Sequence, residues 1–317
     1  RIFDSALTAD QIRLLYERPW IGAEYNETAP LYPPVPSSML PLTSDSINNS
    51  QFGWWPLTET DNYASGAADI SGNSYDLTKT GTVTSEFSAL GTVPLFDGST
   101  GYLRRAQDLS SHTSGVGTVS LWWRLDSTAA NNPADLLFYV GDESTAYGMM
   151  VIAGRVGGSL ASASISFFTY ASGSPQNLLG VYDNGAAWAF DDTWHHFCYV
   201  VDSSSNHMYI DGVEISQSYY PGYGSSSTGN VFLYDATDFD AIRVGSRSAS
   251  SATSAYTQGN VSNVRLWSRA LSSTEVADIY YSPWLGAAYP STGGSSPSYF
   301  VAAQFNRLGI GPRFRRL

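Results

Sequence analysis

The sequence is poor in charge and almost lacks cysteine and lysine. Only 14% of its 317 residues are charged, Lys79 is the only lysine, and Cys198 is the only cysteine. A single cysteine excludes an intrachain disulfide framework and a metal site built on several thiolates. The formal net charge of −12 argues against a general binder of nucleic acid or of anionic membranes, because such ligands need a cationic surface.

Long hydrophobic runs are absent as well. No stretch approaches the roughly 18 apolar residues of a membrane-spanning helix, so we expect no membrane insertion. The chain is instead rich in aromatic residues, with 21 Tyr, 14 Phe and 9 Trp. Aromatic side chains pack well on pleated surfaces, so this composition favours β-strands over helices.

Short segments with a period of two follow one another along most of the chain. Candidate strands lie at 51–57, 93–97, 101–105, 117–125, 135–140, 147–153, 163–170, 194–202, 207–215, 240–246 and 259–267. Turn signals separate them, and Asp211-Gly212 is a strong signal for a two-residue hairpin. Many short strands at this spacing predict an antiparallel sandwich or barrel.

The two ends of the chain share a repeat. Residues 1–25 align without a gap with residues 265–289, and nine positions are identical. Each copy predicts a short strand and a capped helix, and in the second copy the helix is expected near 272–281. The first copy therefore resembles the strand–helix end of an upstream domain. We expect this strand and helix to dock on β-sandwich surface in this subunit or a neighbour. Its predicted assembly residues are Ile12, Leu15, Tyr16 and Trp20.

The remaining chain divides into three parts. Residues 26–50 contain five prolines among Ser and Thr, which predicts a semi-rigid linker. Residues 51–289 form the one complete domain. Residues 290–317 begin with a Ser/Gly/Pro hinge and end in a basic tail, which we expect to dock on a protein partner rather than on nucleic acid. The assembly residues predicted in this tail are Arg313, Arg315 and Arg316.

Several motifs in 51–289 resemble the laminin-G-like, concanavalin-A-like family of lectin and glucanase domains. The most specific is WHHFCYVVDSSSNHMYIDGVEI, a Trp-His-His strand followed by a Tyr-x-Asp-Gly hairpin. LFDGSTGYL, GTVSLWWRLDS and GNVSNVRLWSRALSSTEVADIYY resemble other strands and the closing helix of that family. The resemblance implies an all-β, two-sheet antiparallel jelly-roll sandwich with one short C-terminal helix. It does not imply one function, because this fold carries lectins, adhesion modules, glycosidases and structural domains.

The acidic residues argue against an enzyme. Glycosidases on this scaffold need two carboxylates that face each other across the substrate. No strand here carries Glu-x-Asp or Glu-x-x-Glu. The adjacent acids Asp191 and Asp192 sit in a turn-like segment, and adjacent residues on a strand would point to opposite faces. His195 and His196 belong to the family motif and are interpreted as parts of the fold, as is Cys198, which we expect to be a buried and inert thiol.

One loop could hold calcium. Asp69 and Asn73 offer oxygen ligands in a Gly-containing loop, and related domains often bind Ca²⁺ near this position. The alternative is an Asx turn, in which Asp69 caps its own loop. The closing strand carries Ser262 and Asn263 where the family often has Asp, which weakens the calcium hypothesis. No other cofactor is expected.

Aromatic residues mark a candidate binding surface. Tyr219, Tyr220 and Tyr223 stand among Ser and Gly, a composition typical of adaptable recognition loops, and Trp188 could stack on a sugar ring. The same residues could instead fill the core of the loop or form a subunit contact.

These features together favour a non-catalytic structural or recognition module of a larger surface assembly. The Leu-Tyr-x-x-Pro-Trp ending resembles such domains in bacteriophage structural proteins, so the first expectation is a homo-oligomeric virion surface protein: a head decoration, a head fibre or a tail-associated protein. It would contact other virion subunits and a cell-surface glycan. The alternatives are a secreted, extracellular bacterial carbohydrate-binding or adhesion lectin, and a laminarinase-like enzyme with an unrecognised site.

Overall fold

The computed structural model describes the greater part of the sandwich. The described residues are 47–88, 90–107, 109–112, 115–126, 135–143, 148–154, 164–170, 178–183, 188–219, 227–228, 231–233, 240–249, 252–281 and 283. The predicted strand–helix segment 1–25, nearly all of the linker, the tail 290–317, and the candidate residues Tyr220 and Tyr223 lie outside them.

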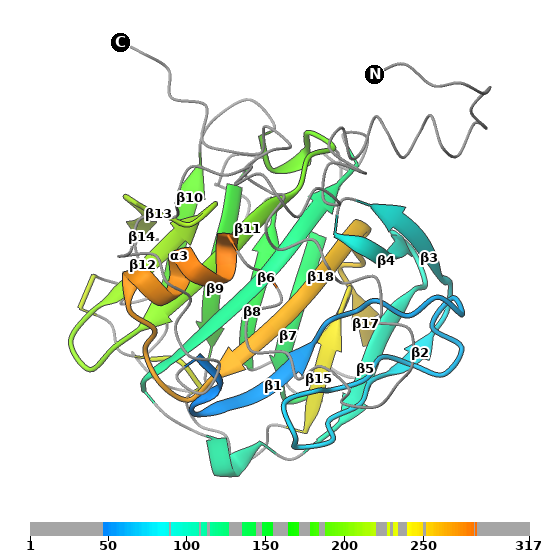
Figure 1. The fold of residues 1–317 in the computed structure, drawn as a ribbon, viewed down its shortest axis with the longest axis horizontal. Helices are drawn as coiled ribbons and strands as arrows, with labels where there is room; N and C mark the ends of the chain where they lie inside the picture. The colour runs from blue at the N-terminus through cyan, green and yellow to red at the C-terminus, as the bar shows by residue number, and fades with distance from the viewer. Residues whose placement is uncertain are drawn as a thin grey trace, which may run out of the picture.

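Two antiparallel eight-stranded sheets form the described fold, as expected from the sequence. The helix-side sheet runs in the order β13 (Val213–Ile215), β12 (Asn206–Ile210), β11 (His195–Val201), β6 (Gly117–Leu125), β18 (Gln258–Trp267), β4 (Gly91–Asp97) and β3 (Val83–Ser88), and β1 (Gln51–Trp55) also pairs with β18. Figure 1 shows β1 and β18 side by side although they come from opposite ends of the domain.

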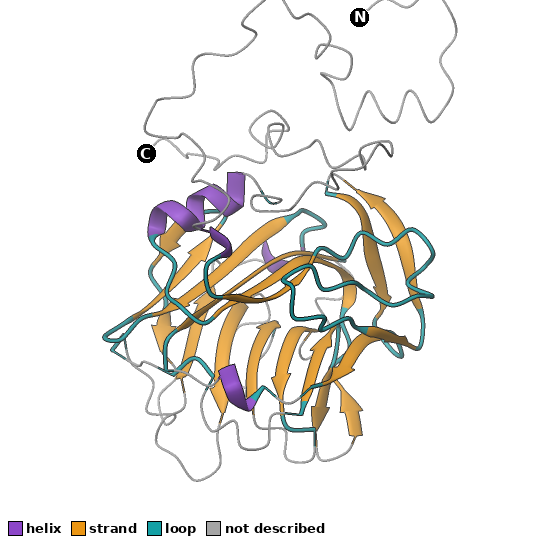
Figure 2. Cartoon of the chain, turned by 60° about the horizontal axis from the view of Figure 1, so that its bottom comes forward, coloured by secondary structure: helices purple, strands orange, loops and turns teal. Residues whose placement is uncertain are grey.

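The facing sheet packs against the inner face of the first. Its order is β14 (Ser218–Tyr219), β10 (Leu178–Asp183), β9 (Ser164–Tyr170), β8 (Gly148–Ala153), β7 (Asp135–Gly141), β15 (Ala241–Val244), β5 (Tyr102–Ala106) and β2 (Thr78–Thr80), and a separate hairpin joins β16 (Arg247–Ala249) to β17 (Ala252–Ser254). Figure 2 shows the two sheets as stacked layers, with α3 (Ser273–Tyr281) outside one of them.

The helix-side sheet is buried on both faces. Trp123 and Phe197 belong to the central core between the sheets, whereas their neighbours Trp122 and Cys198 face the other way, into clusters that include residues of α3. Strand β6 is accordingly buried at every position except Arg124, with no alternation of buried and exposed residues.

Helix α3 starts at the predicted capping box. The Ser272 hydroxyl accepts a hydrogen bond from the Glu275 backbone N–H at 3.2 Å, and Glu275 accepts one from the Ser272 backbone N–H at 2.8 Å. Val276, Ile279 and Tyr280 are buried against the sheet. The helix predicted near 272–281 is therefore confirmed. Among the described residues, no helix is long and apolar enough to cross a bilayer.

The structure differs from the strand predictions in two ways. The predicted strand 207–215 is two strands joined by the Asp211-Gly212 turn. The sequence pattern also misses six strands: β2, β3, β10, β14, β16 and β17. Most of them are two or three residues long, β3 is largely polar, and β10 contains Gly180, so none shows a clear alternation. In addition, the packed chain includes Ile47, whose carbonyl accepts a 2.7 Å hydrogen bond from the Trp267 indole.

Candidate functional site

Aromatic and charged side chains meet where β10 ends and β11 begins. We call Tyr182, Trp188, Asp191, His195 and Asp211 the Trp188 cluster. The Trp188 ring, in a short 3₁₀ helix (Trp188–Phe190), lies 5.3 Å from the Tyr182 ring and 5.3 Å from the His195 ring, nearly perpendicular to both. The three rings come from both sheets and the connection between them, so the cluster exists only in the folded sandwich.

Two turns place carboxylates on either side of His195. Asp211 is the first residue of the hairpin turn after β12, with a φ of 51°, and Gly212 follows with a φ of 76°. This two-residue turn of positive φ returns the chain in register and directs Asp211 toward the start of β11. On the other side, Asp191 accepts a 3.0 Å hydrogen bond from the Thr193 backbone N–H, as in an Asx turn.

His195 is held as a cation between these carboxylates. Its Nδ1 lies 3.0 Å from Asp211 Oδ2, and its Nε2 lies 3.3 Å from Asp191 Oδ1 and 2.9 Å from the Thr193 hydroxyl. Burial opposes the charge, but the hydrogen bonds to Asp191 and Asp211 outweigh it and raise the pKa of His195 to about 9. Burial likewise opposes ionisation of Asp191, yet His195 and Thr193 lower its pKa to about 2.

This charge state decides what the site can do chemically. Thr193, His195 and Asp211 follow the order hydroxyl, imidazole, carboxylate of a hydrolytic triad. A general base must be unprotonated, however, and His195 is protonated at neutral pH. The Thr193 hydroxyl also hydrogen-bonds to Asp191 Oδ1. The arrangement therefore suits binding rather than nucleophilic attack.

Some polar atoms of the cluster remain open to a ligand. Within the described residues, Asp191 Oδ2 accepts no hydrogen bond and the Tyr182 hydroxyl makes none. Trp188 Nε1 also has no hydrogen-bond partner there, but this atom is buried and is not accessible to a ligand. The Asp191 side chain is 42% exposed. The cluster thus presents an aromatic surface bordered by a carboxylate acceptor.

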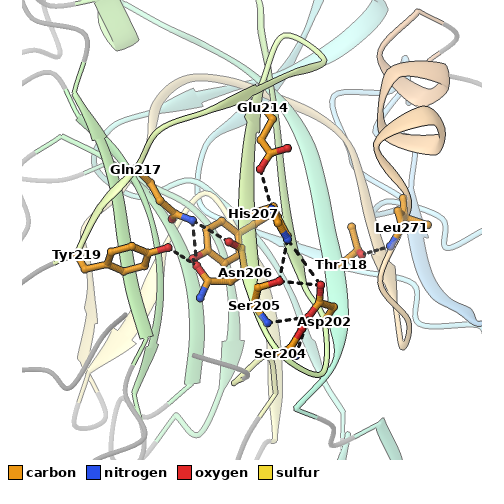
Figure 3. Close-up of polar contacts among 11 residues, drawn as sticks. Thr118, Asp202, Ser204, Ser205, Asn206, His207, Glu214, Gln217, Tyr219 and Leu271 are labelled. Atoms are coloured by element: carbon orange, nitrogen blue, oxygen red, sulfur yellow. Dashed lines mark hydrogen bonds and ion pairs between the residues drawn. The ribbon is translucent and has the colours of Figure 1, made fainter. Parts of the chain in front are cut away.

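Tyr219, the second described candidate, is tied into an internal network. Its hydroxyl donates a 2.8 Å hydrogen bond to Asn206 Oδ1, which also accepts bonds from the Tyr199 hydroxyl and from Gln217 Nε2 (Figure 3). Tyr199 is fully buried and stacks on Phe167 in the core. Tyr219 and Trp188 both pack at the margin of the central core, and among the described residues no ring contact joins them.

A second polar group in Figure 3 supports the hairpin formed by β11 and β12. Asp202 accepts 2.7 Å hydrogen bonds from the backbone N–H groups of Ser204 and Ser205, which closes the turn. His207 Nδ1 lies 2.7 Å from Glu214 on β13. These groups satisfy one another, so their role is to hold the hairpin.

The Asp69 loop has the geometry of an Asx turn. Asp69 Oδ1 accepts bonds from the backbone N–H groups of Trp54 and Ser71, both at 2.9 Å. Its Oδ2 accepts bonds from the Ser71 hydroxyl and the Tyr75 N–H, while Asn73 donates to the Phe52 carbonyl. Among the described residues, no three His, Cys, Asp or Glu side chains are grouped to hold a metal ion. A calcium ion would compete with four donors for Asp69.

The interpretation of His196 and Cys198 as parts of the fold is confirmed. Both side chains are fully buried on the outer face of the helix-side sheet. His196 Nε2 lies 2.8 Å from the Ser120 hydroxyl, and burial lowers the pKa of His196 to about 3, so it is neutral. Burial raises the pKa of the Cys198 thiol, which is therefore unreactive.

Sequence reasoning identified Trp188 but missed its partners. Tyr182 lies on β10, a strand that the pattern does not reveal, and Asp191 was interpreted only as a turn residue. Asp211 was identified as a hairpin signal, and its position beside His195 follows from the two-residue turn, which fixes the register of β12 against β11. This register was the one feature of the sequence that could have predicted the contact between Asp211 and His195.

Comparisons with known proteins place this geometry in a family. The model of the Concanavalin A-like lectin/glucanases superfamily matches residues 97–277, more than half of the chain. The chain therefore belongs to this family, as the sequence motifs predicted. A search of curated proteins found no match.

Two toxin domains of known structure show the same fold at low identity. The receptor binding domain of botulinum neurotoxin C/D mosaic serotype superposes with a TM-score of 0.52 at 11% identity, covering 74% of this chain and 51% of that domain. The binding domain of Paraclostridial Mosquitocidal Protein 1 gives 0.54 at 13% identity, covering 74% and 52%. Domain 4 of AbnA, an extracellular arabinanase from Geobacillus stearothermophilus, gives 0.48 at 16%, covering 73% and 98%. The chain spans about half the length of the two toxin domains.

Proposed function

We propose that this protein is a non-catalytic recognition module that binds carbohydrate at the Trp188 cluster. The observation that carries the proposal is the pairing of a partly exposed aromatic group with an open carboxylate oxygen, beside an imidazole that is locked as a cation. The lectin and glucanase family to which the chain belongs supports it at the level of the fold.

Each part of the cluster has a use in sugar binding. An indole offers a flat apolar surface for the C–H face of a pyranose ring. Asp191 Oδ2 can accept a hydrogen bond from a sugar hydroxyl, and the Tyr182 hydroxyl can donate one. The packing of Trp188 against Trp123 and His195 fixes its ring before the ligand arrives, which lowers the entropic cost of binding.

The same cluster is unsuited to glycoside hydrolysis. A glycosidase needs a carboxylic acid of raised pKa to protonate the leaving group. Asp191 has a lowered pKa, and Asp211 is engaged by His195 and by the backbone N–H of His196. Asp191 therefore cannot supply the proton at neutral pH, and both oxygens of Asp211 are already held by other groups.

A glycan array tests the binding role. We expect the protein to bind a subset of glycans, Trp188→Ala to lose that binding, and Trp188→Phe, which keeps a stacking ring, to retain part of it. Phe87→Ala serves as the control, because Phe87 is an exposed aromatic residue on β3, at the far edge of the helix-side sheet. Binding that survives Trp188→Ala in a folded variant would place the site elsewhere, and sugar release from any bound glycan would contradict the non-catalytic role.

We propose further that the module works within a bacteriophage virion, as a homo-oligomeric surface component such as a head decoration, head fibre or tail-associated protein. The repeat at 1–25, the proline-rich linker and the arginine-containing tail support this, since each is a segment suited to contacts between subunits. The competing proposal is a secreted bacterial adhesion lectin. Mass measurement of the native particle distinguishes them: a symmetric assembly carrying this chain supports the virion role, and a free monomer with glycan affinity supports the lectin.

A further inference from the structure

We infer that the Trp188 cluster selects sugars by charge: it binds amine-bearing sugars best, accepts neutral ones and rejects acidic ones. This inference rests on the proposed function and specifies its ligand class. It comes from the charges that surround the aromatic rings and from which of them a ligand can reach.

The cluster carries a net negative charge. His195 supplies one positive charge, and Asp191 and Asp211 supply two negative charges. The negative charge of Asp211 also acts on the phenols of Tyr182 on β10 and Tyr280 on α3. Burial and this charge together raise the pKa of both phenols. Within the described residues, no Lys or Arg forms a hydrogen bond or ion pair with the cluster.

The positive charge is not available to a ligand. The His195 side chain is only 15% exposed, and both of its ring nitrogens already hydrogen-bond within the cluster. A ligand carboxylate would therefore find no free, positively charged hydrogen-bond donor there. It would also have to approach Asp191, whose exposed Oδ2 repels it.

The negative charge, by contrast, is accessible. The Asp191 side chain is 42% exposed, against 26% for Asp211, whose two oxygens are both engaged. Asp191 contacts His195, whose ring contacts that of Trp188, and Trp188 in turn contacts Tyr182; aromatic faces attract cations. A carboxylate next to such rings is a combination suited to an ammonium group, which can bind the oxygen and contact the rings together.

Three matched probes test the inference: glucosamine, glucose and glucuronate, with their galacto counterparts, titrated by ligand-observed NMR at pH 6 and low salt. A charge near one carboxylate in water is worth about 1 kcal/mol, so we expect about fivefold tighter binding of the amino sugar than of the neutral sugar and about fivefold weaker binding of the uronate. High salt should reduce both differences.

Asp191→Asn should reduce the ratio between the affinities for the amino sugar and the neutral sugar to less than about twofold, whatever its effect on the affinity for the neutral sugar itself. Asp61→Asn is the matched control, because it removes the same charge from an exposed loop that contacts β3, at the opposite edge of the helix-side sheet. If neutral sugars bind through Trp188 but glucuronate binds as tightly as glucosamine, or Asp191→Asn leaves the preference intact, the inference is overturned and the proposed function stands. If no probe binds in a Trp188-dependent way, the proposed function fails first.

Discussion

His195 shows how burial and pairing compete at a single residue. Burial alone would favour a neutral imidazole, as it does for the adjacent His196, but two carboxylates reverse the outcome for His195. Neighbours in sequence thus have opposite charge states, because one side chain faces the Trp188 cluster and the other faces an apolar layer beneath α3. The sequence motif His-His carries no sign of this difference.

The pKa of His195 predicts a pH dependence of stability. Its folded-state value of about 9 lies above the ordinary value of 6.5, so the imidazolium stabilises the fold fully below pH 6.5 and this contribution is lost as the pH rises to 9. At about 1.4 kcal/mol per unit, the loss is at most about 3.5 kcal/mol. We expect the melting temperature of the wild type to fall more steeply over pH 6.5–9 than that of His195→Gln. Parallel curves for the two proteins would contradict the assigned charge.

Arg265 carries an unusual buried positive charge. Its side chain is fully buried, and in the described structure none of its three guanidinium nitrogens has a hydrogen-bond partner. The guanidinium lies 3.9 Å from the Trp54 ring and 4.9 Å from the Trp267 ring, so two indoles offset part of its desolvation. Burial lowers its pKa, which is the sign of an unfavourable charge.

We expect Arg265→Met to be more stable than the wild type, by about 1–3 kcal/mol, because an apolar side chain of similar length removes an unpaired buried charge. The matched control is Arg269→Met. Arg269 forms a two-bond contact with Glu275 and a hydrogen bond to the Asn49 carbonyl, so its loss should destabilise the fold. Chemical denaturation of both variants measures whether each substitution raises or lowers the free energy of unfolding. A strongly destabilised Arg265→Met would show that the indole contacts outweigh desolvation.

At the scale of elements, local chemistry predicted some structures and tertiary packing decided others. The capping box predicted the start of α3, and Asp211-Gly212 predicted the turn that joins β12 to β13. Both signals act within a few residues. By contrast, β10 owes its strand conformation to β9 and β14, and its Gly180 lies where a Cβ would be 2.0 Å from Gln217 Oε1.

The same distinction explains how much of the candidate site was predictable. Trp188 could be selected because an aromatic residue among small and acidic neighbours is visible in the sequence. Tyr182 could not be, because it reaches Trp188 only when the facing sheet packs onto the helix-side sheet. Asp191 and His195 are four residues apart in a segment without helical or strand periodicity, so their contact depends on the turn between them.

The cap of α3 provides a prediction for one element. Ser272→Ala removes the hydroxyl that accepts the Glu275 N–H bond and should destabilise the protein by about 1 kcal/mol. Ser273→Ala is the control, since Ser273 is an exposed residue of the first turn. Equal free energies of unfolding for the two variants would mean that packing of the helix, rather than its cap, determines where it starts.

The Asp69 loop allows calcium to be tested against the Asx turn. If Ca²⁺ binds the folded protein, chelation with EDTA should lower the melting temperature and added Ca²⁺ should restore it, because a ligand of the native state stabilises it by mass action. Asp69→Asn would then abolish the response. The four hydrogen bonds that Asp69 accepts, three from its own loop and one from Trp54 on β1, lead us to expect no shift with either treatment. A reversible shift that depends on Asp69 would establish the metal site.

At the scale of the whole molecule, the sandwich and its closing helix account for the second copy of the repeat. In that copy, Trp267 hydrogen-bonds to Ile47, and Val276, Ile279 and Tyr280 of α3 cover the outer face of a sheet. The first copy has the same pattern of apolar residues and lies outside the described residues. By analogy with α3, we predict that it docks on β-sandwich surface of this subunit or of a neighbour, through the residues Ile12, Leu15, Tyr16 and Trp20.

Deleting residues 1–25 tests this prediction and with it the assembly proposal. Fully burying one large apolar side chain contributes about 1.5–3 kcal/mol, so four of them can offset the ordering of a short helix on a preformed surface. We expect the deletion to leave the circular dichroism spectrum of the sandwich unchanged while shifting the mass measured by light scattering to smaller species. Leu15→Asp should act like the deletion, whereas Arg13→Ser, at a polar position of the same predicted helix, should not. A chain that assembles equally well in all three forms would remove the repeat from the assembly argument and favour the secreted lectin.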